Sequence, residues 1–130
     1  AHGTIKSAVV HSNDGLDELS ISAPTRVVYV CNGELKEEVV DPSQIGLRFW
    51  NIDEVTAGDL DSATDMIYEC LVEKKHGAPR DMVLLSSGMG LFLADKVDSV
   101  SAGIIMSAQS IDSGQTGHLI ERWGEISHSK

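Results

Sequence analysis

Residues 9–18 read Val-Val-His-Ser-Asn-Asp-Gly-Leu-Asp-Glu, an apolar strand that runs into a turn and then into two adjacent carboxylates. Gly15 supplies a position with positive φ, so the chain can reverse sharply as it leaves the strand. Loops at strand ends in α/β folds are where ligands usually bind. Asp17 and Glu18 offer the hard oxygen atoms that hold Mg²⁺ together with waters and substrate phosphates. The stretch therefore predicts a metal-binding loop, and a solvated acidic turn is the alternative.

Three strands are expected around this loop. Apolar residues dominate positions 5–10 without alternation, which is typical of a buried strand of parallel type. Residues 25–31 are rich in β-branched and aromatic side chains, and Asn32-Gly33 follows as a hairpin turn because a type I′ turn needs two positive φ values. Residues 35–40 return as the third strand and end at Pro42. We expect three carboxylates of this hairpin to face solvent: Glu34, Glu37 and Glu38. Only the hairpin has an evident partner within the chain, so the first strand is expected to need a neighbour from elsewhere.

Four helices are expected from residue 59 onward. Apolar residues recur every three or four positions over 60–71, which predicts an amphipathic helix that Asp59 or Asp61 can cap and Gly77 can end. Pro79 suits the first turn of the next helix, where its missing N–H costs nothing.

The second helix, over 82–94, is apolar nearly all round, and its length favours a helix over a strand. Gly88 and Gly90 would weaken its interior, so we expect both to pack closely against a neighbour. A third helix is expected over 100–111 and a fourth over 119–126, each with an apolar stripe. The Asp112-Ser113-Gly114 stretch between them is interpreted as a helix end and a new cap.

Composition fits one compact cytoplasmic domain. The 130 residues are 42% hydrophobic, enough for a core, and the net charge is -10. This charge repels nucleic acid, and the short basic run at 74–76 is interpreted as a helix C-terminus. Any phosphate would therefore be bound through a metal. Cys31 and Cys70 are expected to be buried free thiols in a reducing cytosol, although the two could pair. No membrane span or signal peptide is indicated.

Residues 9–30, VVHSNDGLDELSISAPTRVVYV, resemble the strand, acidic loop and strand in the second half of anthranilate phosphoribosyltransferases. The chain has the family's usual residues at five positions: His11, Gly15, Leu16, Asp17 and Glu18. It departs at Ser12, where the family commonly has glycine. Stretches 41–47, 78–85 and 111–114 agree in the same order, and Ser86 stands where the family usually has asparagine.

The resemblance implies an α/β fold, here part of a three-layer α/β/α domain with three strands, one hairpin among them, followed by four helices. Residues 1–130 would be the C-terminal portion of that domain. The family's glycine-rich phosphate loop and N-terminal helical domain have no counterpart here. We therefore expect a fragment that is inactive alone.

The implied reaction is Mg²⁺-dependent and joins anthranilate to phosphoribosyl pyrophosphate in tryptophan biosynthesis. Asp17 and Glu18 would be the metal ligands, directly or through water. No side chain would be the nucleophile, because the substrate amine attacks.

Two further expectations concern partners. A non-catalytic paralogue or stand-alone binding module is the alternative function, favoured by Ser12, Ser86 and the short chain, whereas the Asp17-Glu18 pair favours the enzyme. Open strand edges and exposed apolar surface predict a homo-oligomer.

Overall fold

An antiparallel sheet followed by four helices makes up residues 5–128, the part of the chain that the computed structural model describes. The sheet consists of β1 (Lys6–Ser12), β2 (Thr25–Cys31) and β3 (Glu34–Val40). The helices are α1 (Leu60–Leu71), α2 (Ala78–Leu93), α3 (Val100–Asp112) and α4 (Gln115–His128). Two short 3₁₀ turns, Pro42–Gln44 and Ile52–Glu54, lie between β3 and α1. The expected α/β fold with three strands and four helices is confirmed.

The β2–β3 hairpin turns where its sequence predicts. Asn32 has φ 50° and Gly33 has φ 87°, the two positive values that a type I′ turn requires. The register runs from Cys31 opposite Glu34 to Thr25 opposite Val40. Its three carboxylates at positions 34, 37 and 38 are exposed, as expected.

The first strand differs from its expectation. β1 pairs with β2 in antiparallel register over its whole length, from Lys6 opposite Cys31 to Ser12 opposite Thr25. It is therefore neither parallel in type nor without a partner in the chain. It is not fully buried either, because 65% of Val9 is exposed. Residues 13–24 double the chain back, and this reversal places β2 beside β1.

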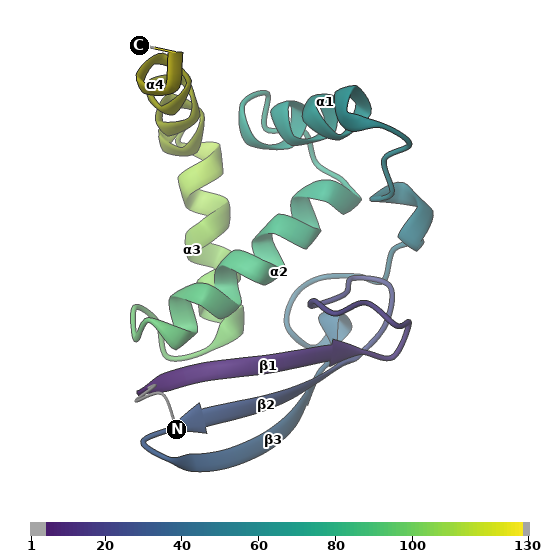
Figure 1. Ribbon diagram of the computed structural model, residues 1–130, viewed down its shortest axis with the longest axis vertical. Helices are drawn as coiled ribbons and strands as arrows, with labels where there is room; N and C mark the ends of the chain where they lie inside the picture. The colour runs from purple at the N-terminus through teal and green to yellow at the C-terminus, as the bar shows by residue number, and fades with distance from the viewer. Residues whose placement is uncertain (1–4, 129–130) are drawn as a thin grey trace.

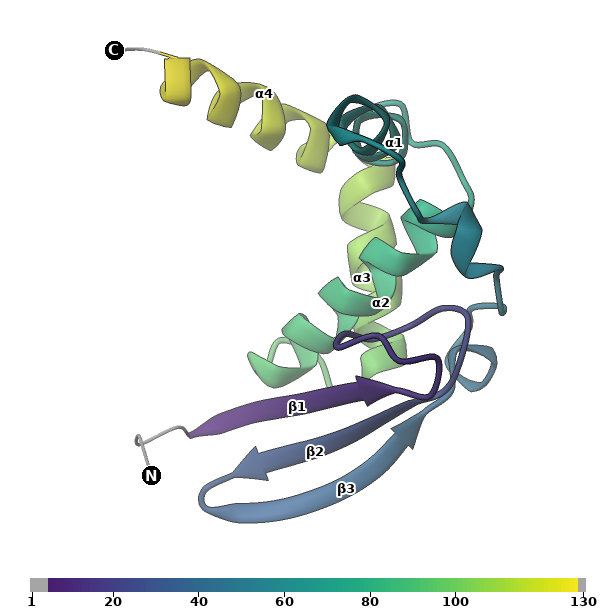
Figure 2. The same cartoon turned by 45° about the vertical axis from the view of Figure 1, so that its right-hand side comes forward.

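The two faces of the sheet have different surroundings. Val27 and Tyr29 of β2 point into the hydrophobic core, with Ala8 and Val10 of β1 and Val40 of β3 packed beside them. Helix α2 lies over this face in Figures 1 and 2. No described helix covers the opposite face, where four apolar side chains are exposed: Ile5, Val9, Leu35 and Val39.

Helices α2 and α3 cross at a contact between glycines. A Cβ on Gly103 would lie 2.4 Å from the Gly88 carbonyl oxygen, so only glycine allows this approach. The expected close packing is confirmed for Gly88. It is wrong for Gly90, where a Cβ would meet no atom within 4 Å. Buried Arg80 of α2 also donates from Nη2 to Oδ1 of Asp112 at 2.7 Å, which joins the two helices.

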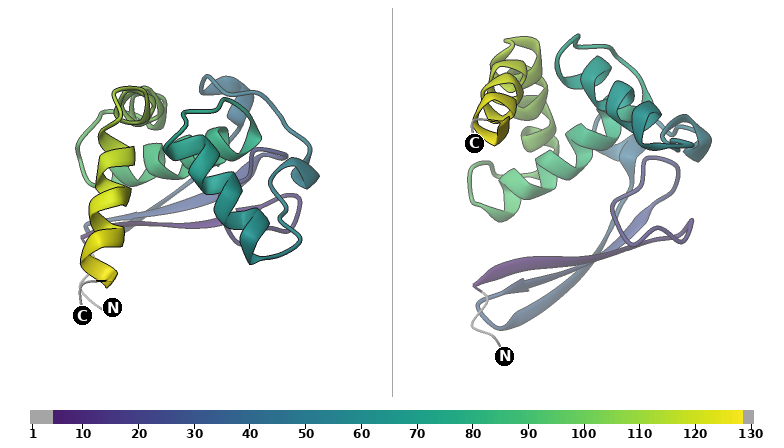
Figure 3. Two further views of the ribbon diagram at one scale, coloured as in Figure 1. Left: turned by 90° about the horizontal axis from the view of Figure 1, so that it is seen from above. Right: turned by 45° about the horizontal axis from the view of Figure 1, so that its top comes forward.

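Helices α1 and α4 lie beyond α2, on the side away from the sheet (Figures 1 and 3). Asp59 caps α1 by accepting a hydrogen bond from the Ser62 amide at 2.8 Å. The sequence predicts that Gly77 ends this helix, and this prediction is wrong. Helix α1 ends at Leu71, the chain turns at Lys74 with φ 63°, and Gly77 instead precedes α2.

Much of the apolar stripe of α4 is open to solvent, and 73% of Trp123 is exposed.

Cys70 is buried as a free thiol, but Cys31 is exposed, which corrects the expectation for that residue. No helix in residues 5–128 is both long enough and apolar enough to cross a membrane.

Candidate functional site

The candidate metal-binding loop occupies residues 13–24, between β1 and β2. In Figure 1 it is the purple segment beyond the end of β1, beside the start of β2. A hydrogen bond from the Asn13 amide to the Pro24 carbonyl at 3.0 Å closes the base of the loop. Because both residues adjoin paired strand ends, the sheet fixes where the loop starts and finishes.

The first turn of the loop is tight. The Ser12 amide donates to the Leu16 carbonyl at 2.9 Å, and the Gly15 amide donates to the Ser12 carbonyl at 3.1 Å. Gly15 has φ 94° and thus supplies the positive φ that its place in the sequence predicts.

Asp14 organises the rest of the loop with both oxygens of its carboxylate. Oδ1 accepts the Leu16 amide at 3.2 Å, and Oδ2 accepts the Ser20 hydroxyl at 2.5 Å. The Ser22 hydroxyl also donates to Oδ2, and the Ser22 amide donates to Oγ of Ser20 at 2.9 Å. We call Asp14, Ser20 and Ser22 the serine clip.

The serine clip changes the acidity of its carboxyl group. Desolvation acts to raise the pKa of Asp14, but the hydroxyls of Ser20 and Ser22 lower it by more, with smaller contributions from Ser12 and from the Leu16 amide. The pKa of Asp14 is therefore held well below its usual value of 3.8. The sequence did not single out this residue, because its serine partners lie six and eight positions away, beyond the range of the usual local side-chain contacts.

The C-terminal side of the loop is anchored in the core. Leu19 and Ile21 are buried, and the Ser20 amide donates to Oγ1 of Thr25 at 3.1 Å. The Trp50 amide donates to the Ile21 carbonyl at 3.0 Å, and its indole Nε1 donates to Oδ2 of Asp81 on α2 at 2.7 Å. The loop is thus connected through Trp50 to the helix that covers the sheet.

Asp17 and Glu18 lie exposed between these two anchored parts. Within residues 5–128, neither side chain has an ion pair or a hydrogen bond, so both carboxylates are available to a ligand. No group of three His, Cys, Asp or Glu side chains in that range could form a metal cage. Two free carboxylates fit Mg²⁺, which commonly binds one or two carboxylates and completes its shell with waters and substrate phosphates.

The two positions that depart from the family pattern lie in different environments. Ser12 is 1% exposed, and its hydroxyl lies 3.5 Å from the Pro24 carbonyl and contributes to the low pKa of Asp14. Ser86 is exposed on α2. Ser12 is therefore accommodated within the loop structure.

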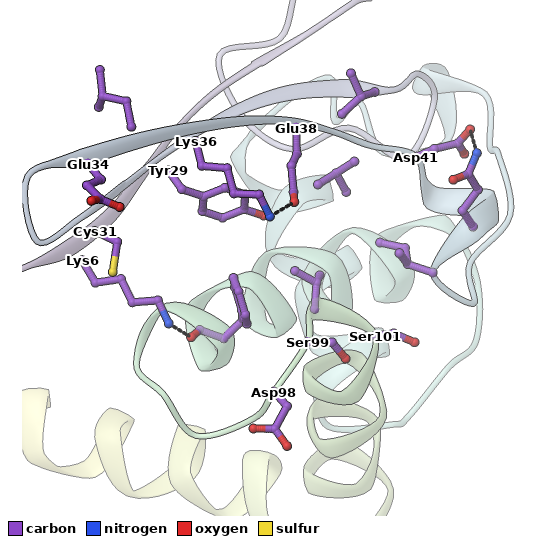
Figure 4. A pocket seen from close by; sticks show the side chains of 17 residues that line it. Lys6, Tyr29, Cys31, Glu34, Lys36, Glu38, Asp41, Asp98, Ser99 and Ser101 are labelled. Carbon is purple, nitrogen blue, oxygen red and sulfur yellow. Dashed lines mark hydrogen bonds and ion pairs between the residues drawn. The ribbon is translucent and has the colours of Figure 1, made fainter.

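A separate cleft of about 620 Å³ lies between β3 and the start of α3 (Figure 4). Lys6 donates to the Phe92 carbonyl at 2.9 Å and pairs with Asp95, and Lys36 pairs with Glu38. Both lysines that line the cleft are thus neutralised by carboxylates. The pKa of Tyr29 in the same cleft is raised, mainly by burial and to a smaller extent by the negative charge of Glu38. No residue of the acidic loop lines it, so it is not part of the candidate metal site.

Comparison with known proteins gives one family match. The family described as "Glycosyl transferase family, a/b domain" matches residues 2–117. An anthranilate phosphoribosyltransferase from Mesorhizobium japonicum is 35% identical over 128 residues, which are 98% of this chain and 38% of that protein. The enzyme of the same name from Symbiobacterium thermophilum is 36% identical over 126 residues, 97% of this chain and 37% of that protein. The chain thus spans little more than a third of these relatives.

Solved structures show the same fold. The crystal structure of anthranilate phosphoribosyltransferase from Thermus thermophilus superposes with a TM-score of 0.80 and 27% identity, covering 91% of this chain and 34% of that one. The Saccharomyces cerevisiae enzyme in complex with PRPP and Mg gives a TM-score of 0.77 and 26% identity, covering 89% of this chain and 33% of that one. The similarity includes nearly all of the described residues.

Proposed function

The chain belongs to the glycosyl transferase family with an a/b domain, and on that premise we propose that it supplies the acidic metal loop of an anthranilate phosphoribosyltransferase. The reaction would join anthranilate to phosphoribosyl pyrophosphate with Mg²⁺, in tryptophan biosynthesis. The observation that carries the proposal is the free Asp17-Glu18 pair on an internally bonded loop. The names of the relatives and the Mg- and PRPP-bound yeast structure support it.

The proposed chemistry requires little from this chain beyond charge and position. The bond between C1 of the ribose and the pyrophosphate breaks, and the anthranilate amine forms the new bond to C1. A bound Mg²⁺ would supply Lewis-acid stabilisation of the departing pyrophosphate. Asp17 and Glu18 would hold the metal, directly or through water, and keep it at the phosphates. No side chain of this chain would act as nucleophile.

The remaining parts of such a site would come from outside these residues. We propose that residues 1–130 correspond to the C-terminal portion of the phosphoribosyltransferase α/β domain. The glycine-rich phosphate loop and the helical domain of a complete enzyme would then be supplied by another segment. A chain that holds only one part of the substrate contacts loses the effective molarity of a complete site, so it should be inactive alone.

Two features of the wider setting belong to the same proposal. A homo-oligomer is supported by the uncovered face of the sheet, where the apolar side chains of Val9 and Leu35 are exposed. A cytoplasmic location agrees with a biosynthetic enzyme that carries the buried free thiol of Cys70.

The alternative of a non-catalytic module loses one of its arguments. Ser12 in place of the family's glycine favours it, yet Ser12 is buried in the loop, where its hydroxyl donates to the Pro24 carbonyl at 3.5 Å. The departure at this position is therefore compatible with the proposed metal loop.

A chimera tests the proposal directly. Residues 5–128 replace the matching C-terminal part of the Thermus thermophilus enzyme, whose fold they share. We expect a folded chimera to form phosphoribosyl anthranilate in the presence of Mg²⁺, and the unjoined chain to form none. A chimera that folds and binds anthranilate but has no turnover at any Mg²⁺ concentration would contradict the proposed function.

A further inference from the structure

One carboxylate holds the loop on both sides of the candidate metal ligands. Oδ1 of Asp14 accepts the amide of Leu16, the residue directly before Asp17. Oδ2 of the same group accepts the hydroxyl of Ser20, two residues after Glu18. The candidate metal ligands therefore lie within a closed ring whose junction is the side chain of Asp14.

Asp14 is itself a poor candidate for a metal ligand. Its two oxygens accept hydrogen bonds from Leu16, Ser20 and Ser22, so a metal would have to displace these donors. Asp17 and Glu18 have no such bonds within residues 5–128. The loop thus separates one carboxylate that organises the backbone from two that remain free.

We propose that Asp14, through the serine clip, is a positioning residue that sets the geometry of the Asp17-Glu18 pair and thereby its affinity for Mg²⁺. This inference rests on the proposed function. Ligands that are held in the bound arrangement before the metal arrives lose less freedom on binding, and groups that orient metal ligands commonly change metal affinity by about 10-fold to 100-fold when they are removed.

Metal binding is measured without relying on catalysis. Mn²⁺, a paramagnetic stand-in for Mg²⁺, is titrated into the ¹⁵N-labelled 130-residue chain, and broadening of the Asp17 and Glu18 amide signals gives the midpoint. We expect Asp14→Ala to raise this midpoint about 10-fold. Asp14→Asn should raise it less, because the amide oxygen can take the place of one of the two carboxylate oxygens as acceptor. Hydrogen exchange at the Leu16 amide should be faster than in the unmodified chain in both variants, and fastest in Asp14→Ala.

Asp41→Ala is the matched control. Asp41 also accepts a backbone amide and a hydroxyl, both from Ser43, at 2.9 and 2.6 Å, but this contact adjoins the turn after β3 and encloses no carboxylate pair. We expect its Mn²⁺ midpoint to equal that of the unmodified chain. If Asp14→Ala does not fold, Ser22→Ala removes one of the three donors and should give a smaller rise of the same sign.

The outcomes separate the two proposals. If Asp17→Asn/Glu18→Gln weakens Mn²⁺ binding but Asp14→Ala and Ser22→Ala leave the midpoint unchanged, the positioning role is overturned and the metal loop stands. If the double variant binds Mn²⁺ like the unmodified chain, the metal loop is overturned, and the positioning role with it. If Asp14 acts only through Asp17 and Glu18, adding Asp14→Ala to the double variant should not raise the Mn²⁺ midpoint further. A rise as large as the one that Asp14→Ala causes in the unmodified chain would overturn the positioning role.

Discussion

Gly88 and Gly103 meet at the crossing of α2 and α3, where a Cβ on Gly103 would lie 2.4 Å from the carbonyl oxygen of Gly88 and 2.7 Å from its Cα. The atoms that such a Cβ would meet belong to backbone, which cannot rotate away as a side chain can. The contact therefore sets how closely the two helices approach, and it keeps α3 against the helix that covers the sheet.

We predict that Gly103→Ala destabilises the chain by at least about 1–3 kcal/mol, the usual cost of overpacking a core, because the two backbones must separate. Gly90→Ala is the matched control on α2, since its Cβ would meet nothing within 4 Å. Alanine is the better helix former, so this control should be stabilising by up to about 1 kcal/mol. Urea unfolding compares the two, and equal midpoints would show that the glycine contact is not tight.

We predict that Asp17→Asn or Glu18→Gln in an active chimera lowers the catalytic rate more than it weakens anthranilate binding. Each amide keeps the shape of the side chain but removes one negative charge from the metal site. Steady-state kinetics over a Mg²⁺ titration should show a lower rate and a higher metal requirement. Asp53→Asn, an exposed carboxylate in the turn before α1, serves as the control. If the rate and the metal dependence are unchanged in both loop variants, Asp17 and Glu18 do not bind the metal and form only a solvated turn.

Asp14 should make stability depend on acid. Its pKa is depressed in the folded chain, so the folded state releases this proton more readily than the unfolded state does. The stabilisation is therefore fully present above the unfolded value of 3.8 and is lost as the pH falls below it toward the folded pKa. We predict that the unmodified chain loses more stability than Asp14→Asn between about pH 5 and about pH 2.

Urea midpoints across that range provide the measurement. Asp59→Asn is a useful comparison, because hydrogen bonds from the Ser62 amide and hydroxyl also lower the pKa of Asp59 at the start of α1. In both variants the urea midpoint should fall less steeply with decreasing pH than in the unmodified chain, because each lacks one carboxylate whose pKa is lowered by folding. A profile for Asp14→Asn that parallels the unmodified chain would show that the serine clip does not favour the charged form.

The uncovered face of the sheet should associate with second copies at micromolar concentration. Val9 lies on this face opposite Val28, and Leu35 and Val39 extend the apolar surface along β3. We predict that Val9→Glu shifts sedimentation equilibrium toward the monomer, because burying a carboxylate in a contact between copies is costly. Thr64→Glu adds the same charge to an exposed position on α1 and should leave the association unchanged. A compact monomer for the unmodified chain would contradict the prediction.

The local structure of this protein follows from short-range signals in its sequence. The Asn32-Gly33 pair sets the hairpin, Asp59 starts α1, and the spacing of apolar residues in 100–111 identifies the buried side of α3. Each of these signals acts between residues only a few positions apart, so the neighbouring residues are enough to interpret it. The position of the acidic pair at the end of a strand follows in the same way.

Other features depend on residues that are distant in the sequence and become neighbours only when the chain folds. A mainly apolar stretch such as 5–10 suits a parallel or an antiparallel strand, and only the return of residues 13–24 brings β2 beside it. The apolar stripe of α4 predicts a helix but not what lies against it, and Trp123 is exposed. The serine clip forms because that same return brings Ser20 and Ser22 back to Asp14. Chain reversal is a property of the folded backbone, which is why the residue that organises the candidate site was not found from its sequence position.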